Sequence, residues 1–148
     1  MRIFSTIFLL FTVLLTGCAT PTLNFEMASA EKLNTDRWGD SYSVTMRVYQ
    51  LSDTARFEEA SYEALWKSDE ATLGATLVST REFIVEPNRE EVFALERSAG
   101  AKFVAVAAFF RSHESNNWRA VKKINYDLPA DTNLTLSLTD KTVELGYQ

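Results

Sequence analysis

Near its carboxyl end the chain alternates apolar and polar residues without interruption. The apolar positions are Leu134, Leu136, Leu138, Val143, Leu145 and Tyr147. Successive side chains of a β-strand point to opposite faces of a sheet, so this spacing predicts two half-buried strands. Asp140 and Lys141, which lie between them, predict a tight turn.

Similar patterns earlier in the chain predict further strands at residues 23–27, 44–51, 77–85, 91–95, 103–110 and 118–126. The continuous apolar run Phe103–Phe110 is typical of a central strand covered on both faces. Pro87 and Asn88 separate two of the strands and predict a hairpin. About eight strands with short connections are best buried as two packed antiparallel sheets, so the predicted fold is an all-β, two-sheet antiparallel β-sandwich.

One segment has helical spacing instead. Apolar and small residues recur every three or four positions from Phe57 to Leu65, and Ser52–Thr54 offers an N-cap. A second helical turn is predicted to begin near Ser68 and to close at Gly74. We expect this small insert between the second and third strands to pack across an edge or an end of the sheets.

The amino end resembles a bacterial lipoprotein signal. Arg2 precedes the apolar run Ile3–Leu15, which is shorter than the roughly 20 residues that span a bilayer. Leu15-Thr16-Gly17-Cys18 matches the lipobox, although an ordinary signal peptide or a buried helix also fits the run. We therefore predict a cleaved signal peptide (1–17), a lipidated Cys18 with a short tether (18–22) and a periplasmic β-sandwich domain (23–148).

Cys18 is the only cysteine, and we expect it to carry an N-acyl group and a diacylglycerol. Each buried methylene of such chains contributes about 0.8 kcal/mol to membrane binding. The next residue is Ala19 rather than Asp. By similarity to the lipoprotein sorting rule, this predicts the periplasmic face of the outer membrane.

Charge and composition exclude several classes of function. The chain carries 15 Lys and Arg against 20 Asp and Glu, so no basic surface for nucleic acid is expected. With Cys18 acylated and His113 the only histidine, neither a Cys-ligated nor a His-rich metal site is expected. No nucleophile elbow, phosphate-binding loop or metal-ligand spacing occurs. We predict a protein that is not an enzyme and has no metal, cofactor or small-molecule substrate.

Trp38 is the residue that most suggests a binding surface. It lies in a polar stretch between Arg37 and Asp40, without obvious apolar cover. Trp and Arg are the residues most enriched at interface hot spots. The alternative is that Trp38 folds back onto the rim of the sandwich, and the residues alone leave both readings open.

Several segments together resemble a known family. They are Met46-Arg47-Val48-Tyr49-Gln50-Leu51, the helix Phe57–Leu65, Asp69 with Leu73-Gly74-Ala75, the strand Phe103–Arg111, and Trp118-Arg119. In this order, after a lipobox, they resemble the type VI secretion outer-membrane lipoprotein family TssJ, also called SciN or VasD. The resemblance covers nearly the whole chain after Cys18.

The resemblance implies a transthyretin-like sandwich and a structural role without catalysis. It implies that the lipoprotein anchors a secretion complex to the outer membrane by binding the periplasmic C-terminal domain of the inner-membrane protein TssM. A protruding loop between the first two strands takes part in that binding. Here the loop maps onto Leu33, Asn34, Thr35, Asp36, Arg37, Trp38, Gly39, Asp40 and Ser41. The alternative function is a pilotin-like or carbohydrate-binding lipoprotein module, with Trp38 and Trp118 as the candidate aromatics.

Overall fold

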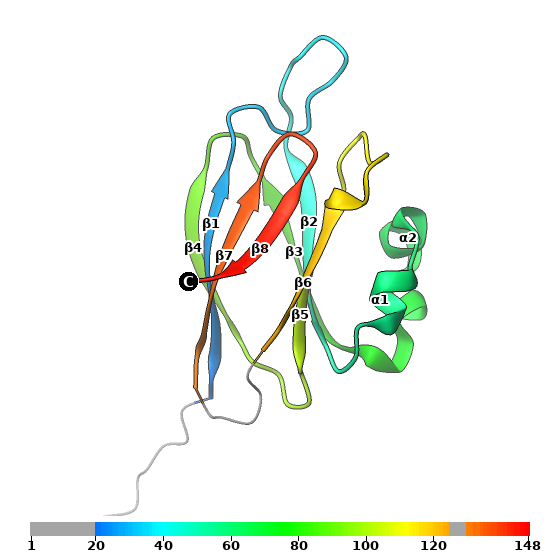
Figure 1. Cartoon of the computed structure of the whole chain (residues 1–148), viewed down its shortest axis with the longest axis vertical. Coiled ribbons are helices and arrows are strands. Elements are labelled where there is room, and N and C mark those ends of the chain that lie inside the picture. Colours follow the sequence, from blue (N-terminus) through cyan, green and yellow to red (C-terminus); the bar gives the residue numbers. More distant parts are fainter. Residues whose placement is uncertain (1–19, 125–129) are drawn as a thin grey trace, which may run out of the picture.

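A computed structural model describes residues 20–124 and 130–148, and within them eight strands form two four-stranded sheets (Figure 1). The strands are β1 (Thr22–Ser29), β2 (Val44–Leu51), β3 (Leu77–Val85), β4 (Glu90–Glu96), β5 (Phe103–Ala108), β6 (Arg119–Lys123), β7 (Thr132–Leu138) and β8 (Val143–Tyr147). One sheet has the order β4-β1-β7-β8 and the other β3-β2-β5-β6. The predicted all-β sandwich of about eight strands is confirmed.

The alternating apolar residues meet between the two sheets. Leu23 and Phe25 of β1 and Leu134 of β7 are fully buried, and their polar neighbours face outward. Phe93 of β4 stacks on Phe25 with ring centroids 4.7 Å apart and lies 4.6 Å from the ring of Phe83 in the facing sheet. Period-two burial from both sheets therefore builds one core.

The pairing of strands differs from the sequence prediction in two respects. The predicted hairpin at Pro87 and Asn88 is wrong, because β3 pairs with β2 and β4 pairs with β1 in the other sheet. The turn between them crosses from sheet to sheet. In addition, β1 and β7 pair in parallel, although every other pair is antiparallel. Local turn chemistry indicates where the chain reverses but not which strand it joins.

The helical insert lies between β2 and β3 as predicted, but it contains two helices and a 3-10 turn. These are α1 (Ala55–Glu59), α2 (Tyr62–Leu73) and η1 (Gly74–Thr76). The predicted continuous helix Phe57–Leu65 is wrong, because Ala60 is extended and the Ser61 hydroxyl accepts a hydrogen bond from the Ala64 N–H, capping α2. Ser68 kinks α2, and Gly74, with φ +52°, ends it as expected.

The insert covers the outer face of the second sheet rather than an edge or an end of the sandwich (Figure 1). Phe57 of α1 is 1% exposed and packs against the ring of Tyr49, 5.8 Å away. Arg119 of β6 donates hydrogen bonds to the carbonyls of Phe57 and Ala60 at 2.7 and 2.8 Å. This cover explains why β2 is buried on both faces from Tyr49 to Leu51.

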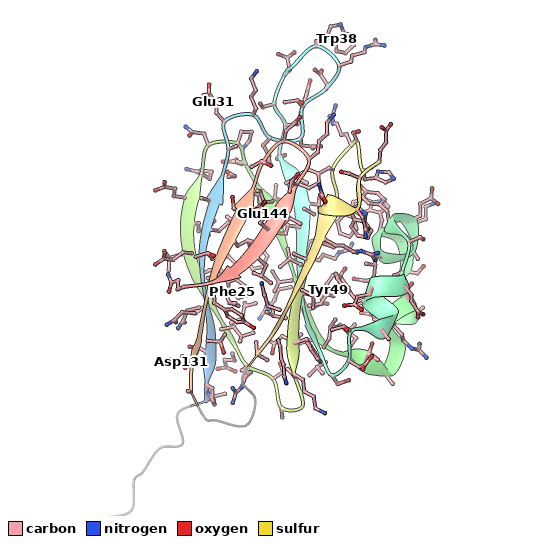
Figure 2. The ribbon with its side chains drawn as sticks, in the orientation of Figure 1. Phe25, Glu31, Trp38, Tyr49, Asp131 and Glu144 are labelled. Atoms are coloured by element: carbon pink, nitrogen blue, oxygen red, sulfur yellow. The ribbon has the colours of Figure 1, made fainter. Side chains whose placement is uncertain are left out.

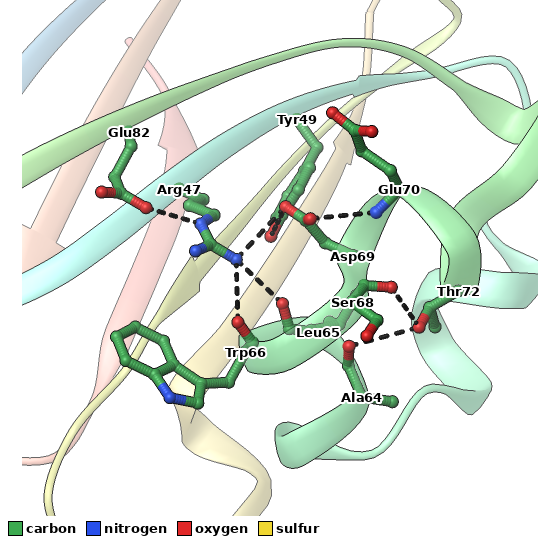
Figure 3. A network of polar contacts seen from close by, with 10 residues as sticks. All are labelled: Arg47, Tyr49, Ala64, Leu65, Trp66, Ser68, Asp69, Glu70, Thr72 and Glu82. Carbon is green, nitrogen blue, oxygen red and sulfur yellow. Dashed lines mark hydrogen bonds and ion pairs between the residues drawn. The ribbon is translucent and has the colours of Figure 1, made fainter.

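Arg47 on β2 ties α2 to the sheet (Figure 3). Its guanidinium donates to the Leu65 carbonyl at 2.9 Å and forms ion pairs with Asp69 at 3.2 Å and Glu82 at 2.7 Å. Desolvation opposes the charge of Arg47, but these acceptors outweigh it and raise its pKa. The Tyr49 hydroxyl also donates to Asp69. The pKa of Tyr49 is raised, mainly by burial and to a smaller extent by the charge of Asp69. Asp69 is therefore a structural anchor between α2 and the sheet.

The remaining strand predictions agree with the structure where it describes them. β5 is the predicted central strand, since Val104–Ala108 is buried on both faces. The predicted strand 118–126 begins with a short 3-10 turn that buries Trp118, and β6 then runs to Lys123. Its last two positions lie outside the described residues.

A candidate partner-binding loop

The chain between β1 and β2 protrudes from one end of the sandwich, with Trp38 near its apex (Figure 2). The start of β1 at Thr22 lies at the opposite end of the domain (Figure 1). We refer to residues 30–43 as the β1–β2 loop. It contains all nine residues predicted to bind a partner.

The base of this loop is part of the core. Leu33 is fully buried and Asn34, with φ +50°, is 5% exposed. The Asn34 amide donates to the Ser43 carbonyl at 2.8 Å and accepts a 2.8 Å hydrogen bond from the Arg111 N–H. A single buried amide therefore closes the loop and joins it to the segment that follows β5. Leu33 and Asn34 are thus buried and support the base of the loop.

The β7–β8 turn holds the loop from a second side. The carboxylate of Asp140 accepts hydrogen bonds from the Thr35 N–H at 2.8 Å and the Thr35 hydroxyl at 2.7 Å. Desolvation raises the pKa of Asp140, but these bonds and the charges of Lys141 and Lys32 outweigh it and lower the pKa. The ionised carboxylate is thus the form that fixes the loop.

Asp36 organises the tip. Its carboxylate accepts hydrogen bonds from the N–H groups of Trp38 and Asp40 at 2.9 and 3.0 Å, and from the Tyr42 hydroxyl at 3.3 Å. Gly39, with φ +88°, allows the chain to turn back. Desolvation raises the pKa of Asp36, and the hydrogen bonds from Trp38, Asp40 and Tyr42 lower it by more. The Asp36 carboxylate thus ties the two sides of the tip together.

Trp38 is 71% exposed, so the alternative in which it folds back onto the rim is wrong. The Arg37 guanidinium lies 3.9 Å from the centroid of its ring. Arg37, Trp38, Gly39 and Asp40 are exposed, whereas Thr35, Asp36 and Ser41 are half-buried. The loop thus presents an aromatic ring and a cation on a tied backbone, an arrangement suited to binding another protein.

Two further residues at this end were missed by sequence analysis. Tyr42 is 37% exposed, and the Arg111 guanidinium lies 3.9 Å from the centroid of its ring. Arg111 is about 70 positions further along the chain, and only the fold brings it to the loop. No sequence signal pairs the two.

Neither a metal-binding group nor a helix able to span a membrane occurs in the described residues. In residues 20–124 and 130–148, no group of three or more His, Cys, Asp or Glu is placed to hold a metal ion. No helix of that part is both long and apolar enough to cross a bilayer. His113 is exposed and stacks on Tyr62, with ring centroids 3.6 Å apart. Cys18 and the signal segment lie outside the described residues.

The fold and the loop define a class: a two-sheet β-sandwich with a helical insert on one face and a tied, protruding loop at one end. A family model described as "Type VI secretion lipoprotein, VasD, EvfM, TssJ, VC_A0113" matches residues 21–141. The chain therefore belongs to this family of type VI secretion lipoproteins. Comparison with curated protein sequences gives no significant match.

Solved structures agree with the family assignment. The lipoprotein TssJ1 from Pseudomonas aeruginosa has 22% identity and a TM-score of 0.81, covering 88% of this chain and 98% of that one. A chain in a structure described as "Type VI membrane complex" has 29% identity and a TM-score of 0.76, with 86% and 98% covered. A chain in "T6SS protein TssM C-terminal domain (869-1107) from EAEC" has 28% identity and a TM-score of 0.71, with 84% and 96% covered. Nearly all of each solved chain is matched, so the relatives fold as this one domain.

Proposed function

We propose that this protein anchors a type VI secretion membrane complex to the outer membrane by binding the periplasmic C-terminal domain of TssM, without catalytic activity. In this proposal an N-acyl group and a diacylglycerol on Cys18 hold the chain in the membrane. The β1–β2 loop binds the partner. The observation that carries the proposal is Trp38, 71% exposed on a loop whose backbone is fixed by Asp36 and Asp140.

The fixed backbone matters because ordering a loop on binding costs free energy. A tip that is already held by four hydrogen bonds to the Asp36 side chain and carbonyl avoids most of that cost. An exposed Trp on such a tip supplies apolar area in a defined position. This combination favours a role for Trp38 in binding a specific protein over an exposure of Trp38 that has no function.

The position of the loop supports the same proposal. Three residues lie between Cys18 and Thr22, and the four residue steps span about 14 Å at most. An acylated Cys18 therefore keeps the start of β1 close to the membrane, and the β1–β2 loop, at the other end of the domain, points away from it (Figure 1). A partner reaching across the periplasm would meet the loop first.

The glycan-binding alternative receives less support. Of the two aromatic side chains predicted to line a sugar-binding groove, Trp118 is 4% exposed and is unavailable to a ligand. Its ring packs against half-buried Tyr62, with ring centroids 5.2 Å apart.

Calorimetric titration of the domain from Ala19 onward with the TssM periplasmic domain tests partner binding. We expect Trp38→Ala to weaken affinity about tenfold or more. Replacing Asp36–Asp40 by a flexible Gly-Ser segment is expected to abolish binding. Val92→Ala, which trims an apolar side chain 76% exposed on β4, is the matched control and should leave affinity unchanged. Unchanged affinity after the loop replacement defeats the loop assignment, and failure of the unaltered domain to bind defeats the partner assignment.

The anchor is tested separately in cells. Cys18→Ser removes the acylated thiol while leaving the domain unchanged. We expect the variant protein to fold and to bind TssM in a pull-down. We expect a strain that makes only this variant to have lost secretion. Normal secretion from a strain that makes only the unacylated protein would contradict the anchoring role.

A further inference from the structure

The docking end of the molecule is wider than the β1–β2 loop. The Arg111 N–H donates to the side chain of buried Asn34, which seats the start of the β5–β6 connection against the base of the loop. The Arg111 side chain then turns over Tyr42, with its guanidinium carbon 3.9 Å from the ring centroid. Two segments far apart in sequence therefore form one surface.

This surface repeats one chemical unit. Arg37 lies over Trp38 at 3.9 Å, and Arg111 lies over Tyr42 at the same distance. All four side chains are exposed. A guanidinium stacked on a ring is oriented by it, but its N–H donors lie in the guanidinium plane and stay available.

The carboxylates of Asp36 and Asp140, which lie near these arginines, already accept hydrogen bonds from other groups of the loop. The Asp36 carboxylate accepts hydrogen bonds from two backbone N–H groups and from the Tyr42 hydroxyl, and the Asp140 carboxylate binds Thr35. Among the described residues, no carboxylate lies within 4 Å of the guanidinium of Arg37 or Arg111. Asp40 is close enough to influence Tyr42 but makes no ion pair with either arginine. Two oriented cations thus remain without an internal acceptor in a chain whose net charge is −5.

We propose that Arg111, stacked on Tyr42, is a second binding element beside the β1–β2 loop, and that Arg37 and Arg111 pair with carboxylates of the partner segment that covers Trp38. The proposal rests on the proposed function, because it assigns chemistry to the same partner. The planar fork of Arg matches a carboxylate with two parallel hydrogen bonds, which Lys does not reproduce. The partner segment therefore carries acidic side chains around an apolar contact.

The test is the affinity of the domain for the TssM periplasmic domain at low and at high salt, with Arg111→Ala, Arg111→Lys and Arg37→Ala. We expect Arg111→Ala to weaken binding about tenfold and Arg111→Lys to recover only part of that loss. Each Ala variant should also show a shallower dependence of affinity on salt than the unaltered protein, since one charge pair is lost. The Arg111 N–H bond to Asn34 involves the backbone, so folding is preserved, and thermal unfolding of each variant checks this.

Arg89→Ala is the matched control. Arg89 is an exposed arginine at the same end of the sandwich, but it pairs with Glu86 and stacks on no aromatic ring within residues 20–124 and 130–148. We expect less than a twofold change for it.

Each of the other outcomes overturns a distinct part of the account. If the unaltered domain does not bind TssM, the proposed function and this inference fail together. If Trp38→Ala weakens binding but Arg111→Ala does not, only the second element fails. An equal loss in Arg89→Ala would make the effect a general charge effect. A loss in Arg111→Ala with an unchanged salt dependence would exclude carboxylate pairing.

Discussion

Two insertions flank β2, and one buries its main aromatic side chain whereas the other exposes it. The β1–β2 loop precedes the strand and exposes Trp38 (71%) at its tip. The helical insert follows the strand and buries Phe57 (1%) against Tyr49. The insert therefore adds to the core of the domain, whereas the loop leaves apolar surface exposed.

Polar anchors hold both insertions, but in different positions. Arg47 reaches out from the sheet and donates hydrogen bonds to the Leu65 and Trp66 carbonyls of α2 (Figure 3). Asn34, Asp36 and Asp140 instead fix the backbone of the loop at its base and turn, and leave the tip in solvent. The polar contacts of the insert thus join it to the sheet, whereas those of the loop hold an exposed tip, as the proposed function requires.

Phe57→Ala should have the largest effect on stability. The change leaves a cavity between α1 and the sheet and is expected to lower the free energy of unfolding by about 3–4 kcal/mol. Urea unfolding measures it. Glu58→Ala, on the exposed side of the same helix, is the control and should change the value by less than about 0.5 kcal/mol. A loss below about 1 kcal/mol for Phe57→Ala would mean that the insert is not part of the core.

Arg47→Met comes next. The aliphatic part of the side chain is kept, but Asp69 loses its ion pair and the Leu65 carbonyl loses the hydrogen bond from Arg47, so we expect a loss of about 2–3 kcal/mol. Lys67→Met, which removes an exposed pair with Glu63 on the same helix, should cost less than about 0.5 kcal/mol. Affinity for TssM, measured below the unfolding transition, should be unchanged. Lost affinity in a folded Arg47→Met protein would place the insert in the interface.

Asp140→Asn should have a smaller effect that depends on pH. The lowered pKa of Asp140 in the folded state means that its ionised form stabilises the fold above the unfolded pKa, which is about 3.9. That contribution disappears as pH falls through this value toward the folded pKa. We expect Asn to cost about 0.5–1 kcal/mol at pH 7, since the group is partly exposed. The gap between the two proteins in urea unfolding should narrow as pH falls below the unfolded pKa of about 3.9. A gap that is constant with pH would exclude the carboxylate as the anchor.

Trp38→Ala should affect stability least. Its ring contacts solvent and Arg37, so we expect a change below about 0.5 kcal/mol. Trp118→Ala, by contrast, empties a buried site and should cost about 3 kcal/mol or more. Thermal unfolding of the two variants compares them directly. Similar losses would mean that Trp38 supports the fold.

The sequence predicted those features that depend on neighbouring residues. Alternation identified β7 and β8, and the small and apolar spacing around Phe57 identified the insert. It did not predict that β3 and β4 belong to different sheets, because strand pairing depends on contacts distant in the chain. Polar loop composition made Trp38 conspicuous, but its exposure depends on Asp36 turning the backbone outward.

The same limit applies to Arg111. Its place beside Tyr42 follows from buried Asn34, which accepts a hydrogen bond from a backbone 77 positions away. An Asn in a polar stretch carries no sign of such a partner. Residues that act through their own chemistry were visible in the sequence, and residues brought to the site by the fold were not.

The difference between the two insertions is tested most directly by hydrogen exchange of the domain with and without the TssM periplasmic domain. We expect the partner to slow exchange in residues 31–42 and 111–117 and to leave α1 and α2 unchanged. Protection confined to α1 and α2, with the β1–β2 loop exchanging as in the free domain, would contradict the account.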